Sequence, residues 1–189
     1  MATMTDKNEV PTKLLWVDLE MTGLDFNKDV ILEIAVEVTD FNFKTIASYE
    51  AVIKQPEEVL SKMNEWATTQ HNASGLVERI RSTGRPEDEV KHEFVGFIKA
   101  QFGDELAILA GNSIHNDRKF IDRWWPEVAE LLHYRMLDVS SFKILMQGKY
   151  GVVFEKNNSH RAFDDIQASI AELQFYLEKL TEVLVKKDA

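Results

Sequence analysis

The sequence predicts an α/β fold, in which a mixed sheet of three antiparallel strands plus two parallel strands is flanked by helices. Two observations predict it. The first third of the chain holds three closely spaced apolar segments with strand-like patterns, and the remainder alternates short apolar runs with amphipathic stretches. Segments close in sequence pair most economically as an antiparallel meander, whereas strand–helix alternation is typical of parallel strands.

Three strands are expected in the first part of the chain. They are LLWVDLE at 14–20, the alternating segment from Val30 to Val38, and a segment around Ala47 to Ile53. Thr22 and Gly23 end the first run, as suits a buried strand. The second run has a period of two, which predicts a strand that is buried on one face.

Helices and two further strands are expected in the rest of the chain. Residues 56–102 are expected to be helical, with Pro56 and Pro86 in first turns. Two strands are expected, LAILAG at 106–111 and a short segment at 136–138, each followed by a helix, the first beginning near Asp117 and the second near Val139. A loop is expected at 147–159. The last helix is expected to pack one apolar face on the sheet through Ile166, Ile170, Leu173, Leu177 and Leu180.

One domain is expected over residues 12–182. The chain has 189 residues, 44% of them hydrophobic, which is enough for one buried core. We expect a flexible polar tail at residues 1–11 and a second polar tail at 183–189. No apolar run approaches a membrane span, and the first residues lack the pattern of a secretion signal or a transit peptide. We therefore expect a soluble, cytoplasmic protein.

Composition restricts the chemistry. The chain has no cysteine, which excludes disulfides, zinc–thiolate sites and thiol nucleophiles. Its formal net charge of -10 argues against a protein that holds a long nucleic acid in a basic groove. A short substrate remains compatible with this charge, because bound divalent cations and a few basic side chains can hold two or three phosphates.

Acidic residues suggest a site. Asp18 and Glu20 are two residues apart on a predicted strand, so both side chains leave the same face. This pair alone equally fits a strand end at which acids reach water or form salt bridges. A functional site is favoured over a structural role because Asp117 follows another predicted strand. His160 and Asp165 at the start of the terminal helix favour it further.

Four carboxylates brought together repel one another unless they are protonated or neutralised. Hard oxygen ligands suit Mg²⁺ or Mn²⁺, and two such ions can stabilise the attacking and leaving oxygens of a phosphodiester. A histidine beside them would act as a general base. Asp164 and Asp165 diverge by roughly 100° on a helix, so one of the two can share a face with the site.

Four segments carry a family resemblance. They are DLEMTGLD at 18–25, GNSIHNDRKF at 111–120, HYRMLDVSS at 133–141 and SHRAFDDI at 159–166. In this order and separation they resemble oligoribonuclease, the short-RNA branch of the 3′→5′ exonuclease superfamily whose members share an Asp-Glu-Asp-Asp-His set. The resemblance extends from about Leu14 to Leu180.

The resemblance implies a ribonuclease H-like fold, a homodimer and two divalent ions, Mg²⁺ or Mn²⁺, in each active site. It also implies release of 5′-mononucleotides from short RNA, dinucleotides included. By this match the metal ligands are Asp18, Glu20, Asp117 and Asp165, and His160 is the general base.

The same resemblance assigns residues to substrate binding. Leu24 is expected to act as a wedge between bases, and Trp66 and His71 to make stacking and 3′-terminal contacts. Each has a structural alternative: Leu24 could cover a strand end, Trp66 could be a core aromatic, and His71 could be a capping or surface histidine.

A second group is expected at the other end of the substrate. Tyr134 would reach the neighbouring subunit's site, and Arg135 with Ser113 and Ser140 would bind the terminal phosphate. Arg135 could otherwise be a salt-bridge partner in an acidic protein.

The chain departs from the family pattern between about Ile144 and Lys156, where a basic, tryptophan-containing stretch is expected. The alternative function is another exonuclease of the superfamily, acting on DNA or on the 3′ ends of longer RNA. A non-catalytic nucleic-acid-binding module with this fold is a further alternative. The negative charge and the HYRMLDVSS segment favour short RNA.

Overall fold

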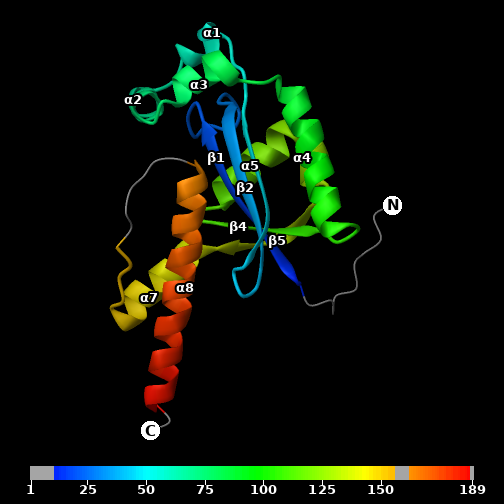
Figure 1. The fold of residues 1–189 in the computed structure, drawn as a ribbon. Helices are drawn as coiled ribbons and strands as arrows, with labels where there is room; N and C mark the ends of the chain where they lie inside the picture. Colours follow the sequence, from blue (N-terminus) through cyan, green and yellow to red (C-terminus); the bar gives the residue numbers. More distant parts are fainter. Residues whose placement is uncertain (1–10, 156–161, 188–189) are drawn as a thin grey trace.

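The computed structural model describes residues 11–155 and 162–187. Within these residues five strands form one sheet in the order β3-β2-β1-β4-β5 (Figure 1). The strands are β1 (Lys13–Met21), β2 (Ile31–Asp40), β3 (Thr45–Val52), β4 (Ala107–Gly111) and β5 (Leu132–Asp138). Pairing of β1 with β2 and of β2 with β3 is antiparallel, and pairing of β1 with β4 and of β4 with β5 is parallel. The predicted mixed sheet is confirmed, and the acidic strand β1 is at its centre.

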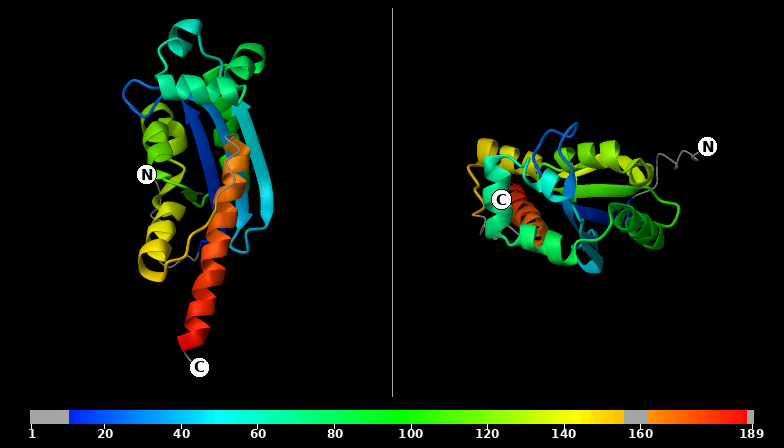
Figure 2. Two further views of the ribbon diagram at one scale, coloured as in Figure 1. Left: turned by 90° about the vertical axis from the view of Figure 1, so that its left-hand side faces the viewer. Right: turned by 90° about the horizontal axis from the view of Figure 1, so that it is seen from above.

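Helices cover both faces and one end of the sheet. They are α1 (Glu57–Leu60), α2 (Glu65–Ala73), α3 (Leu76–Thr83), α4 (Glu87–Phe102), α5 (His115–Trp124), α6 (Pro126–Ala129), α7 (Val139–Tyr150) and α8 (Ala162–Lys187). Helices α4 and α5 pack on one face, and α7 and α8 on the other. Helices α1 to α3 gather at the end of the sheet where β1 finishes (Figures 1 and 2). In the described parts of the chain, no helix is both long and apolar enough to cross a membrane.

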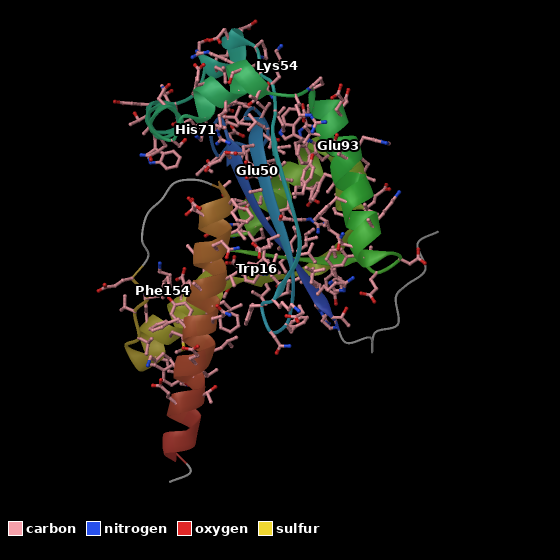
Figure 3. The ribbon with its side chains drawn as sticks, in the orientation of Figure 1. Trp16, Glu50, Lys54, His71, Glu93 and Phe154 are labelled. Atoms are coloured by element: carbon pink, nitrogen blue, oxygen red, sulfur yellow. The ribbon has the colours of Figure 1, made fainter. Side chains whose placement is uncertain are left out.

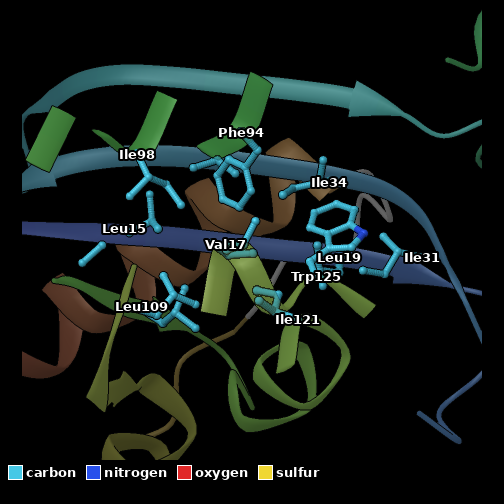
Figure 4. Close-up of a cluster of buried hydrophobic side chains, with 14 of the residues drawn as sticks. Leu15, Val17, Leu19, Ile31, Ile34, Phe94, Ile98, Leu109, Ile121 and Trp125 are labelled. Carbon is cyan, nitrogen blue, oxygen red and sulfur yellow. The ribbon is translucent and has the colours of Figure 1, made fainter. Parts of the chain in front are cut away.

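Alternate side chains of β1 enter two separate cores. Leu15, Val17 and Leu19 pack with residues of α4 and α5 in the larger core (Figure 4). Leu14 and Trp16 face the other way and pack against α8. This alternation is the period of two expected for a strand buried on both faces.

The side chains on the α8 face of β1 are apolar at the start of the strand and acidic at its end. After Leu14 and Trp16, the next two side chains on this face are Asp18 and Glu20. Figure 3 shows Trp16 level with the middle of α8, whereas His71 lies near the sheet end that α1 to α3 cover. The apolar part of this face therefore anchors α8, and the acidic part is left at the end of the sheet beside α2.

Several element boundaries differ from the prediction. The helical character predicted for residues 56–102 is confirmed, with two breaks that were not predicted. Helix α2 begins after Asn64, whose side chain accepts a hydrogen bond from Ala67 N–H, and Gly75 with φ 74° separates α2 from α3. Pro56 and Pro86 directly precede α1 and α4 instead of lying in their first turns. Asparagine N-caps begin helices and left-handed glycines end them through local backbone geometry, which the spacing of apolar residues does not reveal.

The second half differs in a similar way. Strand β5 begins at Leu132 instead of near Met136, so Tyr134 and Arg135 lie within a strand and not before it. Helix α7 continues to Tyr150, so the first part of the loop predicted at 147–159 is helical. Leu177 of the predicted α8 stripe is exposed, and Tyr176 is buried in its place. The tail expected at residues 1–11 lies outside the described residues except for Pro11, and His160 also lies outside them.

Candidate active site

Three carboxylates meet where β1 ends and α8 begins. Carboxylate oxygens of Asp18, Glu20 and Asp165 lie within 4.8 Å of one another, and all three residues are half-buried. The strand period brings Asp18 and Glu20 to the same face, and Asp165 comes from the first turn of α8. Asp164 is exposed, since the next position on a helix is turned by roughly 100°.

Asp117 reaches the backbone of the same strand. It lies in the first turn of α5 and is buried, and its Oδ1 accepts a hydrogen bond of 3.0 Å from the backbone N–H of Leu19. Leu19 is the residue between the two acids of β1. Asp117 is therefore fixed next to Asp18 and Glu20, although it is outside the cluster of three carboxylates found among the described residues.

Burial and mutual repulsion make this site hold protons unusually well. Burial, followed by the charges of Glu33, Asp165 and Asp117, raises the pKa of Glu20 to about 7, and Arg79 opposes the rise. Burial also raises the pKa of Asp117 to about 7, against the lowering effect of the Leu19 N–H. Both shifts have ordinary physical causes, because desolvation and nearby like charges each disfavour the ionised carboxylate.

The donor set fits a hard divalent cation. The three clustered residues offer carboxylate oxygens, the ligands that Mg²⁺ and Mn²⁺ prefer. A cation among them would replace the protons that repulsion otherwise retains. Asp18, Glu20 and Asp165, with Asp117 beside them, are thus the residues that could hold such ions.

His71 borders the acidic cluster. It is a buried residue of α2, and its Nε2 lies 2.8 Å from the carbonyl oxygen of Met21. A carbonyl only accepts, so Nε2 carries the proton and donates it, and Nδ1 is left 3.8 Å from Glu20 Oε2. Burial lowers the pKa of His71, which keeps the ring neutral. The alternative of a surface histidine is excluded.

Leu24 projects from a tightly held loop. Its side chain is 71% exposed. Asp29 organises the loop, because its Oδ1 accepts from the Thr22 hydroxyl and its Oδ2 from the Asp25 backbone N–H, each at 2.9 Å. A β carbon at Gly23 would collide with the Asp29 carboxylate. The leucine is thus presented to solvent by a fixed loop and does not cover the end of the strand.

Trp66 is a second exposed apolar side chain near this site. It lies in the first turn of α2, the helix that carries His71, and is 64% exposed. A core role for this residue is therefore excluded. Large apolar side chains that the fold leaves in water commonly mark binding surfaces.

Ser113 and Ser140 come together although 27 residues separate them. Ser113 N–H donates to Ser140 Oγ at 2.9 Å and to Asp138 Oδ1 at 3.0 Å, and the two hydroxyl oxygens are 3.1 Å apart. Asp138 also accepts from Ser140 N–H as the cap of α7. The sequence analysis did not single out Asp138, although an acid two residues before Ser140 at a predicted helix start is a capping signal.

Tyr134 and Arg135 make contacts with each other and with His133. The Tyr134 ring is 73% exposed and stacks on His133 with ring centres 4.5 Å apart. The Arg135 guanidinium lies over the Tyr134 ring, 5.2 Å from its centre. Both side chains are on β5, one of the two edge strands of the sheet.

One charged pair near the site was missed by sequence reasoning. Glu33 of β2 is paired in register with Glu20 and is buried. Arg79 of α3 binds both Glu33 oxygens, at 2.5 and 2.9 Å, and also lies 3.9 Å from Glu50. The pair fastens α3 to the sheet and brings a positive charge towards the acids. The register between β1 and β2, which sequence does not contain, is the signal that would have revealed it.

Solved structures share this fold. Escherichia coli exonuclease I in complex with a 5cy-dA13 oligonucleotide is 16% identical, with a TM-score of 0.61, and the match covers 90% of this chain and 43% of that one. The zinc-bound form of the same enzyme with single-stranded DNA gives a TM-score of 0.66 at 15% identity, covering 93% and 43%. The chain therefore spans less than half the length of exonuclease I. At such identities the likeness concerns the fold alone.

Sequence similarity is more specific. The family model described as Exonuclease matches residues 15–173. The chain is 41% identical over 180 residues to the mitochondrial oligoribonuclease of Homo sapiens, covering 93% of this chain and 76% of that protein. It is 43% identical over 172 residues to an oligoribonuclease of Francisella tularensis, covering 90% and 97%. Fold, acidic site and similarity agree, and the chain belongs to the exonuclease family, on its oligoribonuclease branch.

Proposed function

We propose that this protein is a 3′→5′ exoribonuclease that hydrolyses short oligoribonucleotides, dinucleotides included, to 5′-mononucleotides. The observation that carries the proposal is the cluster of Asp18, Glu20 and Asp165 within 4.8 Å at the end of β1. Oligoribonuclease relatives that match at least 90% of the chain support the substrate class.

Divalent ions are part of the proposal. Asp18, Glu20, Asp117 and Asp165 would hold two Mg²⁺ or Mn²⁺ ions, directly or through water. When bound, such ions supply positive charge for the attacking and leaving oxygens of a phosphodiester. The protein contributes a fixed arrangement: Asp117 is held by Leu19 N–H, and α8 brings Asp165 to β1.

His160 is proposed as the general base. It is five residues before Asp165 and therefore close in sequence to a residue of the acidic cluster. It would take the proton from the attacking water. A neutral imidazole is needed for this, so activity should rise with pH through the pKa of that histidine.

Side chains around the site would hold a very short substrate. Exposed Leu24 would separate two bases, and exposed Trp66 with the buried His71 at the border of the acidic cluster would contact the 3′-terminal nucleotide by stacking and hydrogen bonding. Ser113, Ser140 and Arg135 would bind a 5′-terminal phosphate. In the free protein the two hydroxyls are already adjacent, whereas Arg135 would have to leave the Tyr134 ring.

A homodimer would complete this arrangement. Strand β5 is one of the two sheet edges. Its Tyr134 and Met136 are exposed, as are Ile144 and Leu145 of α7. Unpaired edges and contiguous apolar side chains favour association with another chain. A twofold contact through β5 and α7 would carry each Tyr134 into the partner's site, where its ring would stack on the substrate.

The test uses purified protein with Mn²⁺ and 5′-labelled RNA from dinucleotides to about ten nucleotides, alongside DNA of the same sequences and longer RNA. We expect diribonucleotides to be the preferred substrates. Degradation of long chains without cleavage of a diribonucleotide would overturn the proposal. Equal turnover of DNA would support the alternative of an exonuclease with broader substrates.

A further inference from the structure

Asn112 links α8 to the serine pair. It directly follows β4, and its Nδ2 donates to Ser169 Oγ and to Glu172 Oε2 of α8, each at 3.0 Å. Its Oδ1 accepts from Ser140 Oγ at 3.4 Å. One amide side chain therefore contacts both the helix that carries Asp165 and the start of α7.

The α8 side of this link is fixed. Glu172 is 1% exposed, and its other oxygen accepts from the Tyr176 hydroxyl at 2.9 Å. Ser169 is also buried, and its hydroxyl donates to the backbone carbonyl of Asp165 at 2.8 Å. Both partners thus sit in a packed part of α8, next to the first turn that holds the metal ligand.

Hydrogen-bond chemistry determines which way the amide points. A carboxylate only accepts, and the single hydroxyl proton of Ser169 is used by Asp165, so both α8 partners require donors. The NH₂ group of Asn112 must therefore face α8, and its oxygen must face Ser140. The 3.4 Å contact from Ser140 is the longest of the three hydrogen bonds that the Asn112 side chain makes.

We propose that Asn112 is a positioning residue that fixes the hydroxyls of Ser113 and Ser140 at a set distance from Asp165. This rests on the proposed function, in which the serines bind a 5′-terminal phosphate and Asp165 holds a metal ion at the scissile bond. Asn112 then sets the separation between the two ends of the substrate. It thereby selects 5′-phosphorylated dinucleotides over substrates in which that phosphate is missing or further away.

The test compares selectivity within each variant. We measure kcat/KM with Mn²⁺ for a 5′-phosphorylated diribonucleotide, its 5′-hydroxyl form and a 5′-phosphorylated pentaribonucleotide. In Asn112→Ser, which loses the contacts to α8, the preference for the phosphorylated dinucleotide should fall about tenfold. The ratio does not depend on how much of the variant is folded, so general destabilisation does not mimic the effect.

A charge swap provides the rescue. Asn112→Asp places a second carboxylate against Glu172 and should also lower the preference. Adding Glu172→Gln exchanges the amide and the carboxylate across the same contact and should restore most of it, since residues in direct contact couple strongly in double-mutant cycles. Asn42→Asp, the same change on the exposed β2–β3 turn, is the matched control.

The outcomes separate the two proposals. Variants with the wild-type preference, or no rescue by the double substitution, would overturn the role of Asn112 while leaving the proposed function standing. A wild-type protein that does not cleave diribonucleotides would overturn the proposed function, and this inference with it.

Discussion

At the scale of single residues, two structural periods separate acids that form the site from acids that do not. The strand period brings Asp18 and Glu20 to one face of β1, and the helical step of roughly 100° turns Asp164 away from the cluster that Asp165 joins. Asp165 and Asp164 are adjacent and have the same side chain, so a substitution of the second is a control for the same substitution of the first.

Asp165→Asn should remove most of the activity, and Asp164→Asn should leave it near the wild-type value. The first change removes a charged ligand from the cluster. The loss in kcat/KM should exceed about 100-fold, the upper range for residues that only support a ligand. Mn²⁺ titration by calorimetry should show weaker binding for Asp165→Asn alone. Similar losses in both variants would contradict this placement.

Protonation of the site predicts an unusual dependence of stability on pH. The pKa of Glu20 is about 7 in the metal-free folded protein, against 4.5 for a freely solvated glutamate. Because the folded state binds the proton more tightly, this group stabilises the fold fully below about pH 4.5 and loses that contribution as pH rises through about 7. The difference corresponds to roughly 3 kcal/mol.

Chemical unfolding in EDTA between about pH 5 and 8 measures this effect. The free energy of unfolding of wild type relative to Glu20→Gln should fall across that range, because glutamine does not titrate. Adding Mg²⁺ at the upper end should restore wild-type stability, since the ion favours the deprotonated carboxylate. A constant difference between the two proteins would show that Glu20 has an ordinary pKa.

The two acids of β1 could be read from the sequence, because they need only the period of one strand. The position of Asp117 cannot be derived from the period of one strand. Its carboxylate is held by a backbone N–H of β1 and not by a side chain. Glu33 and Asn112 were missed, because their roles depend on strand register and on where α8 packs. Sequence contains neither quantity directly.

At the scale of elements, the strands with recurring apolar side chains were predicted better than β5. Strands β1, β2 and β4 are mostly buried, β2 on both faces instead of the one expected, and the mostly exposed β3 still alternates half-buried and exposed side chains from Ala47 to Glu50. Strand β5 exposes Tyr134, Arg135 and Met136 in succession, so alternation is absent and its start was placed four residues late. A strand at the sheet edge can expose successive side chains, and it then lacks the pattern by which strands are recognised.

The loop after β1 provides a prediction at this scale. Gly23→Ala should lower the free energy of unfolding by about 1–3 kcal/mol and raise KM for a dinucleotide, because the added carbon displaces Asp29 and with it the loop that carries Leu24. Urea unfolding and steady-state kinetics measure the two effects.

Gly96→Ala is the matched control. Gly96 lies within α4, and a β carbon there meets no atom within 4 Å. This change should raise the free energy of unfolding by about 0.5–1 kcal/mol and leave KM unchanged. Equal stability changes in both variants would argue that the Asp29 contact does not restrain the loop.

At the scale of the whole molecule, the negative net charge and the exposed side chains of β5 both bear on how substrate would be held. The net charge of -10 disfavours long nucleic acid, so affinity must come from local contacts around the site. The proposed dimer adds one such contact, Tyr134, which the fold leaves 73% exposed on β5. If that ring serves the partner's site, two inactive variants should complement each other.

Tyr134→Ala should lower dinucleotide turnover by roughly tenfold or more, the loss expected for a base-stacking aromatic, without weakening Mn²⁺ binding. Asp18→Asn should abolish turnover. In a heterodimer of the two, one site combines an intact Asp18 with an intact Tyr134 from the other subunit. Random pairing after co-refolding of equal amounts should therefore restore about a quarter of wild-type activity, since half of the dimers are mixed and each has one complete site.

Dimers with two different affinity tags allow the heterodimer to be purified and its activity compared with each parent. Sedimentation should give twice the mass of the single chain for all species. Ile144→Asp, in the exposed apolar part of α7, should yield monomers that retain Mn²⁺ binding and lose the benefit of Tyr134. Activity of the mixture no higher than the sum of the two parents would place Tyr134 in its own subunit's site, or outside any site, and would leave the acidic cluster of one chain to act without a partner.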